Sequence, residues 1–278
     1  MKKIKSYKNG SYFTYTSTIE RGIALVILNA CNIVKIYGEP DSESSTIALN
    51  GVSLSVNKGE FIAIMGPSGS GKSTLLNVLS GIDKPTSGEV TIAGEKLSKI
   101  TGDKLALFRR KQLGFVFQDF NLLDSLTVKE NIILPMVLER KAVPEMESRV
   151  EYLASLFGIE SILDKYPYHI SGGQQQRAAI SRALVNAPSI ILADEPTGNL
   201  DSKSSEVIME CFKKVVDELS TTVLLVTHDV FAASYCQKVV ILKDGTIHSS
   251  ITKKGNRKEF LDQIMNSQAV LGGSTDVF

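Results

Sequence analysis

The chain has 278 residues, of which 31 are basic and 30 are acidic, so its formal net charge is +1. Hydrophobic residues make up 43% of the sequence, which is enough for one large core or two smaller ones and excludes disordered, fibrous and disulfide-scaffold classes. A nearly neutral chain lacks the bulk positive charge that drives binding to a phosphate backbone, so we expect no nucleic-acid partner.

Apolar runs along the chain are short. The longest, residues 23–28 and 223–226, have the length of strands and fall far below the roughly 18 to 20 residues that a membrane helix needs. We therefore expect a chain that does not itself cross a bilayer. The cysteines Cys31, Cys211 and Cys236 show no CxxC spacing, and we expect them to pack in the core of a protein from a reducing compartment.

The first segment differs in composition from the rest. Residues 1–24 are rich in Lys, Ser, Thr and Tyr without a sustained period, whereas a strand-like run starts at Val26. We expect residues 1–24 to be an extension outside the fold. A related hypothesis is that the codons of residues 20–22 are a ribosome-binding sequence, with translation starting at Leu25 or Val26.

Strands and helices then alternate, which is typical of an α/β fold with a largely parallel sheet. Residues 61–65 predict a buried strand, followed by a glycine-rich turn and an apolar helix. Residues 189–193 and 223–226 are continuous apolar runs, as expected for strands that are covered on both faces.

Helical spacing dominates the middle of the chain. It extends over residues 126–159, where Pro135 and Pro144 are expected to limit helices, and residues 171–186 predict another helix that stops at Pro188. Nearer the C-terminus, residues 239–247 predict a hairpin with an Asp-Gly turn, and residues 259–269 predict a short amphipathic helix.

The turn after the first buried strand carries a phosphate-loop motif. It comprises Gly66, Pro67, Ser68, Gly69, Ser70, Gly71, Lys72, Ser73 and Thr74. Its backbone N–H groups and the following helix N-terminus suit phosphate oxygens. Lys72 would reach the β and γ phosphates, and the Ser73 hydroxyl would meet Mg²⁺. The motif predicts that the chain binds a nucleoside triphosphate.

Polar side chains follow three further predicted strands. Asp194 suits the shell of Mg²⁺, and the adjacent Glu195 is placed to orient or deprotonate an attacking water. His228 follows the next strand, so we expect it at the same edge of the sheet, near the γ phosphate. Gln118 ends a fourth strand, where its amide could meet metal or water and link the nucleotide to the helical region.

A second glycine-rich segment opens the helix predicted from residue 171. This segment places two glycines and a serine at a helix N-terminus, and it comprises Ser171, Gly172, Gly173 and Gln174. Such a helix N-terminus is a second anion site, which a simple kinase does not need. With this motif, the chain resembles the ATP-binding subunits of ABC transporters over residues 26–247.

The resemblance implies a P-loop NTPase (RecA-like) core with a mainly parallel sheet, an antiparallel β subdomain and an inserted α-helical subdomain. The implied boundaries are 25–250 for the ABC ATPase domain, 25–118 and 187–250 for its core, 119–186 for the helical insert and 251–278 for a C-terminal extension.

The resemblance also implies roles for single residues. Tyr37 would stack on adenine, and Gln118 would be the glutamine of the Q-loop and a metal ligand. Asp194 and Glu195 match the metal-binding and catalytic carboxylates, Asp201 lies in the D-loop, and His228 matches the switch histidine. The cofactors implied are ATP and Mg²⁺.

The segment Ser171 to Gln174 matches the signature motif, which closes over ATP held by a partner subunit. Two copies of the chain would therefore sandwich two nucleotides, so we expect a homodimer. Ile170 stands where the family usually has Leu, a volume-conserving change that should leave the motif in place.

Longer segments indicate a subgroup. Residues 120–131 and 193–201 are similar to ATPases of macrolide efflux, lipoprotein release and cell division, and residues 228–236, 259–261 and 269–273 are similar to bacitracin-type peptide-resistance transporters. This likeness implies an integral membrane permease as partner, a sensor histidine kinase acting through it, and a location on the cytoplasmic face of the bacterial membrane.

Other ATPase types of the family remain open. They are lipoprotein-release, macrolide-efflux or cell-division ATPases and, more distantly, a soluble ABC ATPase without a transporter. The sequence leaves undecided which substrate is moved, whether ATP drives expulsion, target release or signalling, and what the C-terminal helix does.

Overall fold

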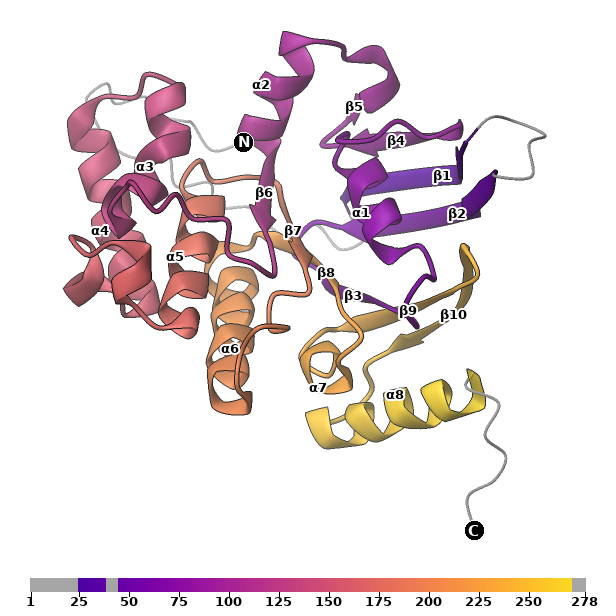
Figure 1. The fold of residues 1–278 in the computed structure, drawn as a ribbon. Helices are drawn as coiled ribbons and strands as arrows, with labels where there is room; N and C mark the ends of the chain where they lie inside the picture. Colours follow the sequence, from indigo (N-terminus) through magenta and orange to yellow (C-terminus); the bar gives the residue numbers. More distant parts are fainter. Residues whose placement is uncertain (1–24, 39–44, 272–278) are drawn as a thin grey trace, which may run out of the picture.

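The computed structural model describes residues 25–38 and 45–271, so the expected extension over residues 1–24 lies outside the described residues (Figure 1). In this part of the chain the strands form two sheets. One has the strand order β2-β1-β4-β5 and the other the order β10-β9-β3-β8-β7-β6. The predicted α/β class, with a mainly parallel sheet and a separate antiparallel one, is confirmed.

The larger sheet is parallel except at one edge, where β9 and β10 form the predicted hairpin. The buried apolar residues form two clusters, one on each face of this sheet. In the strand of residues 61–65, Phe61, Ala63 and Met65 belong to the cluster that includes α3 to α8. Ile62 and Ile64 belong to the cluster that includes α1 and the antiparallel sheet. All five residues are buried, as the continuous apolar run predicts. The strands are β3 Phe61–Met65, β6 Leu113–Val116, β7 Ile190–Asp194, β8 Thr222–Val226, β9 Lys238–Lys243 and β10 Thr246–Thr252.

The smaller, antiparallel sheet packs against α1 and leaves its other face more exposed. Its strands are β1 Val26–Tyr37, β2 Thr46–Asn57, β4 Ser87–Ile92 and β5 Glu95–Lys96. The prediction that all three cysteines pack in the core is wrong for Cys31, which is exposed, and right for Cys211 and Cys236. Strand alternation accounts for this, because Leu28 and Ala30 point into the core and Cys31 therefore points out of it. A register shift in the pairing of β1 with β4 follows Cys31, and Asn32 there has a φ of 49°.

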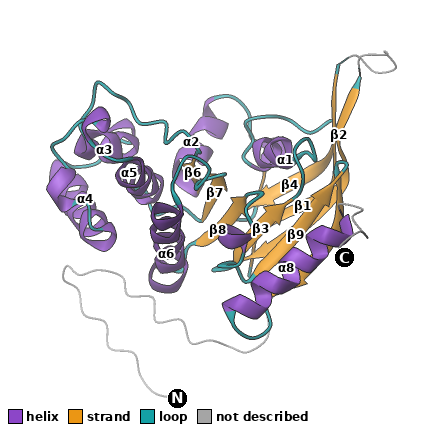
Figure 2. Ribbon diagram, turned by 60° about the horizontal axis from the view of Figure 1, so that its bottom comes forward, coloured by secondary structure: helices purple, strands orange, loops and turns teal. Residues whose placement is uncertain are grey.

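Helices α3, α4 and α5 gather at one side of the larger sheet, as expected for a helical insert (Figures 1 and 2). Pro144 lies in the first turn of α4, at the start of a helix as predicted. Pro135, expected to limit a helix, instead lies inside α3, which continues to Leu138 although Pro135 has no N–H to donate to the Asn131 carbonyl oxygen. The helices are α1 Lys72–Leu79, α2 Asp103–Gln112, α3 Val128–Leu138, α4 Val143–Phe157, α5 Gly172–Leu184, α6 Ser202–Leu219, α7 Val230–Ala233 and α8 Arg257–Leu271, with 3-10 turns η1 Leu97–Lys99, η2 Glu160–Ile162 and η3 Pro167–His169.

The C-terminal helix α8 docks on the core. Its side chains Phe260 and Ile264 are fully buried, which confirms the predicted amphipathic helix. In Figure 1 it lies beside α7 and next to the β9–β10 hairpin. Among the described helices, none combines the length and the apolar character that crossing a membrane requires.

Candidate functional site

The phosphate-loop residues connect the end of β3 to the start of α1, as predicted. Glycine is required at two of these positions by close contacts with the backbone. A Cβ on Gly66 would lie 2.1 Å from the Leu242 carbonyl oxygen, and one on Gly71 would lie 2.5 Å from the Ala48 carbonyl oxygen. Gly71 also has a φ of 99°. The loop is therefore held tightly against the sheet at the N-terminus of α1, where the helix dipole favours an anion.

Lys72 points back into this loop. Its Nζ donates hydrogen bonds of 2.9 Å to the carbonyl oxygens of Gly66 and of Pro67. Burial lowers its pKa, and the nearby carboxylates of Glu195 and Asp194 counteract this. A phosphate in the loop would offer the ammonium charged acceptors in place of two neutral carbonyls.

Asp194 lies at the carboxyl end of β7, facing the start of α1. Ser73 donates a hydrogen bond to this carboxylate, yet Asp194 Oδ1 is buried without a partner in the described residues. Burial, and next the charge of Glu195, raises the pKa of Asp194. An orphaned carboxylate oxygen beside a hydroxyl is the set of hard oxygen ligands that Mg²⁺ prefers, so these two residues fit the ion.

Glu195 and His228 form a pair at the ends of the adjacent strands β7 and β8. Glu195 Oε1 lies 2.9 Å from His228 Nδ1, and Glu195 Oε2 accepts a 3.3 Å hydrogen bond from the His228 backbone N–H. Glu195 has a φ of 45°, a strained value for a residue with a side chain. The Glu195 side chain is 17% exposed and the His228 side chain 70% exposed. The structure thus brings together the two residues that the sequence placed at one edge of the sheet.

Gln118 lies two residues beyond the end of β6. Its Nε2 donates a 3.0 Å hydrogen bond to Asn199 Oδ1, and Asn199 Nδ2 donates one of 2.7 Å to Asp119 Oδ1. A Cβ on Gly198 would lie 2.9 Å from the Gln118 amide nitrogen. The Gln118 side chain is thus placed against the segment before Asp201, and its role as a metal ligand stays a prediction.

The signature residues form the N-terminus of α5. Ser171 caps the helix: its Oγ accepts a 3.4 Å hydrogen bond from the Gln174 N–H, and its own N–H donates one of 3.0 Å to Gln174 Oε1. A Cβ on Gly173 would lie 3.3 Å from the Ser204 side chain, so this end of α5 packs closely against the start of α6.

Asp201 caps the neighbouring helix α6. Its Oδ1 accepts a 2.9 Å hydrogen bond from the Ser204 N–H, and its Oδ2 accepts one of 2.6 Å from the Ser204 hydroxyl. These hydrogen bonds lower the pKa of Asp201. Among the described residues, no hydrogen bond or ion pair joins the signature residues to the phosphate loop. Within one chain they are separate groups.

Sequence reasoning missed one residue that connects these groups. Gln176 is fully buried on α5, and its Nε2 donates hydrogen bonds of 2.7 Å to the Pro196 carbonyl oxygen and 3.2 Å to the Phe117 carbonyl oxygen. It thereby ties the signature helix to the segments that carry Glu195 and Gln118. A polar residue four positions before Ile180, on the apolar face of α5, was the signal that could have revealed it.

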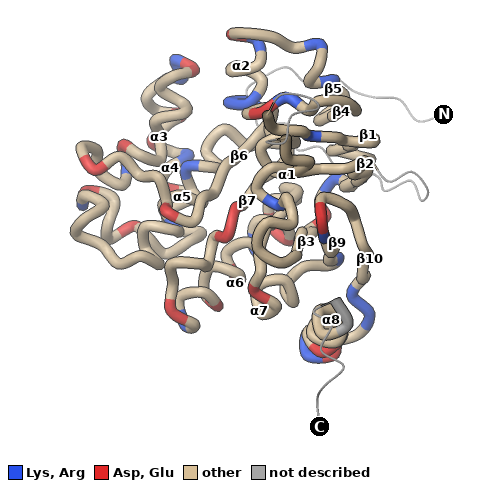
Figure 3. The backbone as a smooth tube through the Cα atoms, turned by 45° about the vertical axis from the view of Figure 1, so that its right-hand side comes forward, with Lys and Arg blue, Asp and Glu red and all other residues tan. Residues whose placement is uncertain are grey.

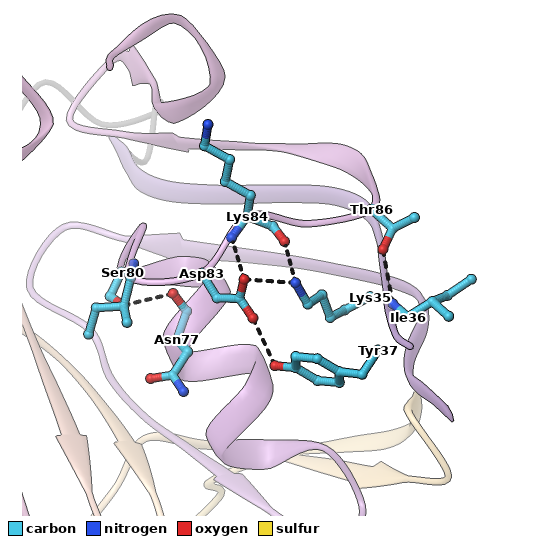
Figure 4. A network of polar contacts seen from close by, with 9 residues as sticks. Lys35, Ile36, Tyr37, Asn77, Ser80, Asp83, Lys84 and Thr86 are labelled. Carbon is cyan, nitrogen blue, oxygen red and sulfur yellow. Dashed lines mark hydrogen bonds and ion pairs between the residues drawn. The ribbon is translucent and has the colours of Figure 1, made fainter. Parts of the chain in front are cut away.

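Tyr37 lies at the end of β1 beside the phosphate-loop segment, where its hydroxyl is hydrogen-bonded to the Thr74 side chain. It is 42% exposed, and its hydroxyl donates a 2.8 Å hydrogen bond to Asp83 Oδ2 (Figure 4). Asp83, which lies four residues past the end of α1, was not singled out from the sequence. An exposed aromatic ring held at the rim of the phosphate-loop helix is suited to stack on a base.

Comparison with known proteins places this geometry in a family. The profile of the ABC transporter family matches residues 49–198. The chain is 51% identical over 252 residues to the uncharacterized ABC transporter ATP-binding protein YvcR of Bacillus subtilis (strain 168), with 91% of this chain and 97% of YvcR covered. It is 47% identical over 250 residues to the bacitracin export ATP-binding protein BceA of Halalkalibacterium halodurans, with 90% of this chain and 98% of BceA covered.

The fold is also similar to a solved structure, the dimeric ATP-binding cassette MJ0796 of Methanocaldococcus jannaschii in a post-hydrolysis state bound to ADP and Pi. The TM-score is 0.74 and the sequences are 43% identical, with 82% of this chain and 99% of the other covered. Together with the phosphate loop, the paired carboxylates and the capped signature helix, these matches show that the chain belongs to the ABC transporter family and is one of its ATP-binding, ATP-hydrolysing subunits.

Proposed function

We propose that this chain is the ATPase subunit of an ABC transporter for antimicrobial peptide resistance, which drives a separate membrane permease by hydrolysing ATP as a homodimer. The observation that carries the hydrolytic part is the pair of Glu195 and His228 beside the phosphate loop. The peptide-resistance part is supported by the 47% identity to BceA, whose name describes bacitracin export.

In the proposed mechanism the triphosphate lies along the loop before α1, with Lys72 on the β and γ phosphates. Ser73, Asp194 and Gln118 would hold Mg²⁺, which when bound neutralises charge on the phosphate oxygens. Glu195 accepts the proton of the attacking water at its carboxylate. His228 holds this carboxylate through Nδ1 and its backbone N–H, so that the carboxylate faces one direction.

A second copy of the chain would complete each site. The Ser171 hydroxyl and the N-terminus of α5 are proposed to contact the γ phosphate of ATP that the other copy holds. This arrangement is supported by the separation of the two groups within one chain. It is also supported by the likeness to MJ0796, whose solved structure is a dimer with ADP and Pi.

The proposed permease contact lies at a hollow beside the Gln118 segment. Its walls include apolar side chains of β6 and α3 and three arginines of α2 and α5, and Figure 3 shows the basic positions on α2. An amphipathic cytoplasmic segment of a permease would suit such a surface. The apolar and basic side chains of this lining are Arg109, Arg110, Leu113, Phe115, Phe117, Leu134, Pro135, Leu138 and Arg182. With this contact the chain would sit on the cytoplasmic face of the membrane and reach a sensor histidine kinase through the permease.

The variant Glu195→Gln tests the hydrolytic role. It keeps the side-chain shape and removes the base, so we expect kcat to fall by about 10² to 10⁴-fold while ATP still stabilises the dimer. Phosphate release gives the rate, and size-exclusion chromatography in Mg-ATP gives the oligomeric state. A variant that hydrolyses at the wild-type rate would contradict the role of Glu195, and one that stays monomeric in Mg-ATP would contradict the sandwich.

Co-purification from bacterial membranes tests the transporter type. We expect the tagged chain to bring down a large permease with an extracellular domain, as the peptide-resistance proposal requires. A permease of the lipoprotein-release, macrolide-efflux or cell-division type would instead favour those alternatives, and the absence of any membrane partner would contradict every transporter function.

A further inference from the structure

The polar network around Tyr37 joins two segments that are distant in sequence, residues 35–37 of β1 and residues 77–86 at and beyond the end of α1 (Figure 4). Asp83 lies at its centre. Its Oδ2 accepts the Tyr37 hydroxyl at 2.8 Å, and its Oδ1 accepts Lys35 Nζ at 2.7 Å and the Lys84 backbone N–H at 2.8 Å. One carboxylate therefore fixes two side chains of β1.

Lys35 is held in turn by two acceptors and by the ring itself. Besides Asp83, its Nζ bonds the Lys84 carbonyl oxygen at 2.9 Å, and the Lys35 side chain is only 12% exposed. The same ammonium lies 4.7 Å from the centroid of the Tyr37 ring. A cation over one face of an aromatic ring is attracted to it and blocks that face to other groups. The base of a nucleotide is left with the opposite face of Tyr37.

Asp83 is in turn anchored to the helix that follows the phosphate loop. The backbone N–H groups of Ile82 and Asp83 donate hydrogen bonds of 3.0 and 3.1 Å to the Asn77 carbonyl oxygen in the last turns of α1. Burial works to raise the pKa of Asp83, but hydrogen bonds from Lys35 and Tyr37 outweigh this and lower it, so the carboxylate stays charged near neutral pH. The far end of the phosphate-loop helix thus sets the position of the Tyr37 ring.

We propose that Asp83 is a positioning residue for the nucleotide base, which together with Lys35 holds the Tyr37 ring so that its free face meets adenine. The proposal rests on the proposed stacking role of Tyr37 and adds the device that orients it. Asp83 itself touches neither the base nor the phosphates. By restricting the Tyr37 side chain before ATP binds, Asp83 reduces the conformational entropy that this side chain loses on binding.

The test separates binding of the base from binding of the phosphates. The intact chain is titrated with ATP and with inorganic tripolyphosphate, both measured by displacement of a fluorescent ATP analogue. In Asp83→Ala we expect the Kd and the KM for ATP to rise by roughly 3- to 10-fold, because the tyrosine must then be ordered on binding. The Kd for tripolyphosphate and kcat should stay within about twofold of the wild-type values, since neither depends on the ring.

Further variants separate a positioning role from a structural one. Asp83→Asn keeps an acceptor for the Tyr37 hydroxyl and loses the charge that holds Lys35, so its Kd for ATP should lie between those of the wild type and Asp83→Ala. In a chain that already carries Tyr37→Phe, Asp83→Ala should have a smaller effect on ATP than it has alone. The exposed Asp164, in the helical region, provides the matched control variant Asp164→Ala.

Three outcomes would overturn the proposal. Equal losses for ATP and tripolyphosphate in Asp83→Ala would indicate damage to α1 rather than a misplaced ring. Unchanged ATP affinity in Asp83→Ala, alongside weakened ATP affinity in Tyr37→Ala, would remove Asp83 and leave the stacking role intact. Unchanged ATP affinity in Tyr37→Ala would remove the stacking role and this inference with it.

Discussion

The buried amide of Gln176 lies where three functional segments meet. Two carbonyl oxygens, those of Pro196 and Phe117, accept hydrogen bonds from its Nε2, and the Gln176 side chain is fully buried. Pro196 directly follows Glu195, and Phe117 directly precedes Gln118. A single side chain on α5 therefore holds the backbone next to both Glu195 and Gln118.

The variant Gln176→Leu measures how much this amide contributes to the free energy of unfolding. Leucine fills a similar volume but removes the donor to the buried Pro196 carbonyl oxygen and one of the two donors to the partly buried Phe117 carbonyl oxygen, which also accepts the Phe120 N–H. We therefore expect the free energy of unfolding to fall by about 1 to 3 kcal/mol. Urea denaturation followed by circular dichroism measures it. Gln175→Leu is the matched control, because that neighbour is half-buried and makes one 3.3 Å hydrogen bond to Ile170. Equal losses in the two variants would contradict the role given to Gln176.

At the level of elements, one cation of α8 contacts the segment that follows His228. The Arg257 guanidinium lies 4.3 Å from the Tyr235 ring centroid and 5.2 Å from that of Phe231. Phe231 belongs to α7, whose N-cap Asp229 directly follows His228. The C-terminal helix therefore packs against α7, the helix that starts directly after the pair of Glu195 and His228.

Replacing Arg257 with methionine keeps the aliphatic stem and removes the cation. We expect Arg257→Met to lower the free energy of unfolding by about 0.5 to 1 kcal/mol, the usual contribution of a partly exposed cation–π contact. Lys258→Met is the matched control, since Lys258 is the next residue along α8 and is exposed. Urea denaturation of both variants measures the difference, and a larger loss in the Lys258 variant would be inconsistent with this contact.

The elements were predicted correctly where the burial of apolar side chains dominated. Apolar runs covered on both faces could only be the buried strands β3, β7 and β8, and the phosphate loop had to follow the first of them. Prediction failed where local rules competed with tertiary packing. Pro135 did not end α3. The exposure of Cys31 has another cause, because the alternation that buries Leu28 and Ala30 puts Cys31 on the outer face of β1. Contacts such as those of Asp83 and Gln176 depend on segments far apart in the chain, which no local pattern encodes.

For the whole molecule, the decisive feature is that the phosphate loop and the signature helix form separate groups. If each site takes its loop from one chain and its signature from the other, two different inactive chains can repair each other. Lys72→Ala removes the cation from the phosphate loop. Ser171→Asp keeps a side-chain acceptor for the Gln174 N–H at the helix cap but places a negative charge opposite the γ phosphate.

Each variant alone should hydrolyse almost no ATP, because both sites of its dimer carry the defect. In an equal mixture, random pairing makes half of the dimers mixed, and each mixed dimer has one site with an intact loop and an intact signature. We therefore expect the mixture to recover up to about a quarter of the wild-type sites, seen as phosphate release that appears only after the two chains are combined. Mixing each variant with itself at the same total concentration is the control. If the mixture stays as inactive as its components while size-exclusion chromatography shows that mixed dimers form in Mg-ATP, then the signature does not act across the interface, and the site must be completed within one chain.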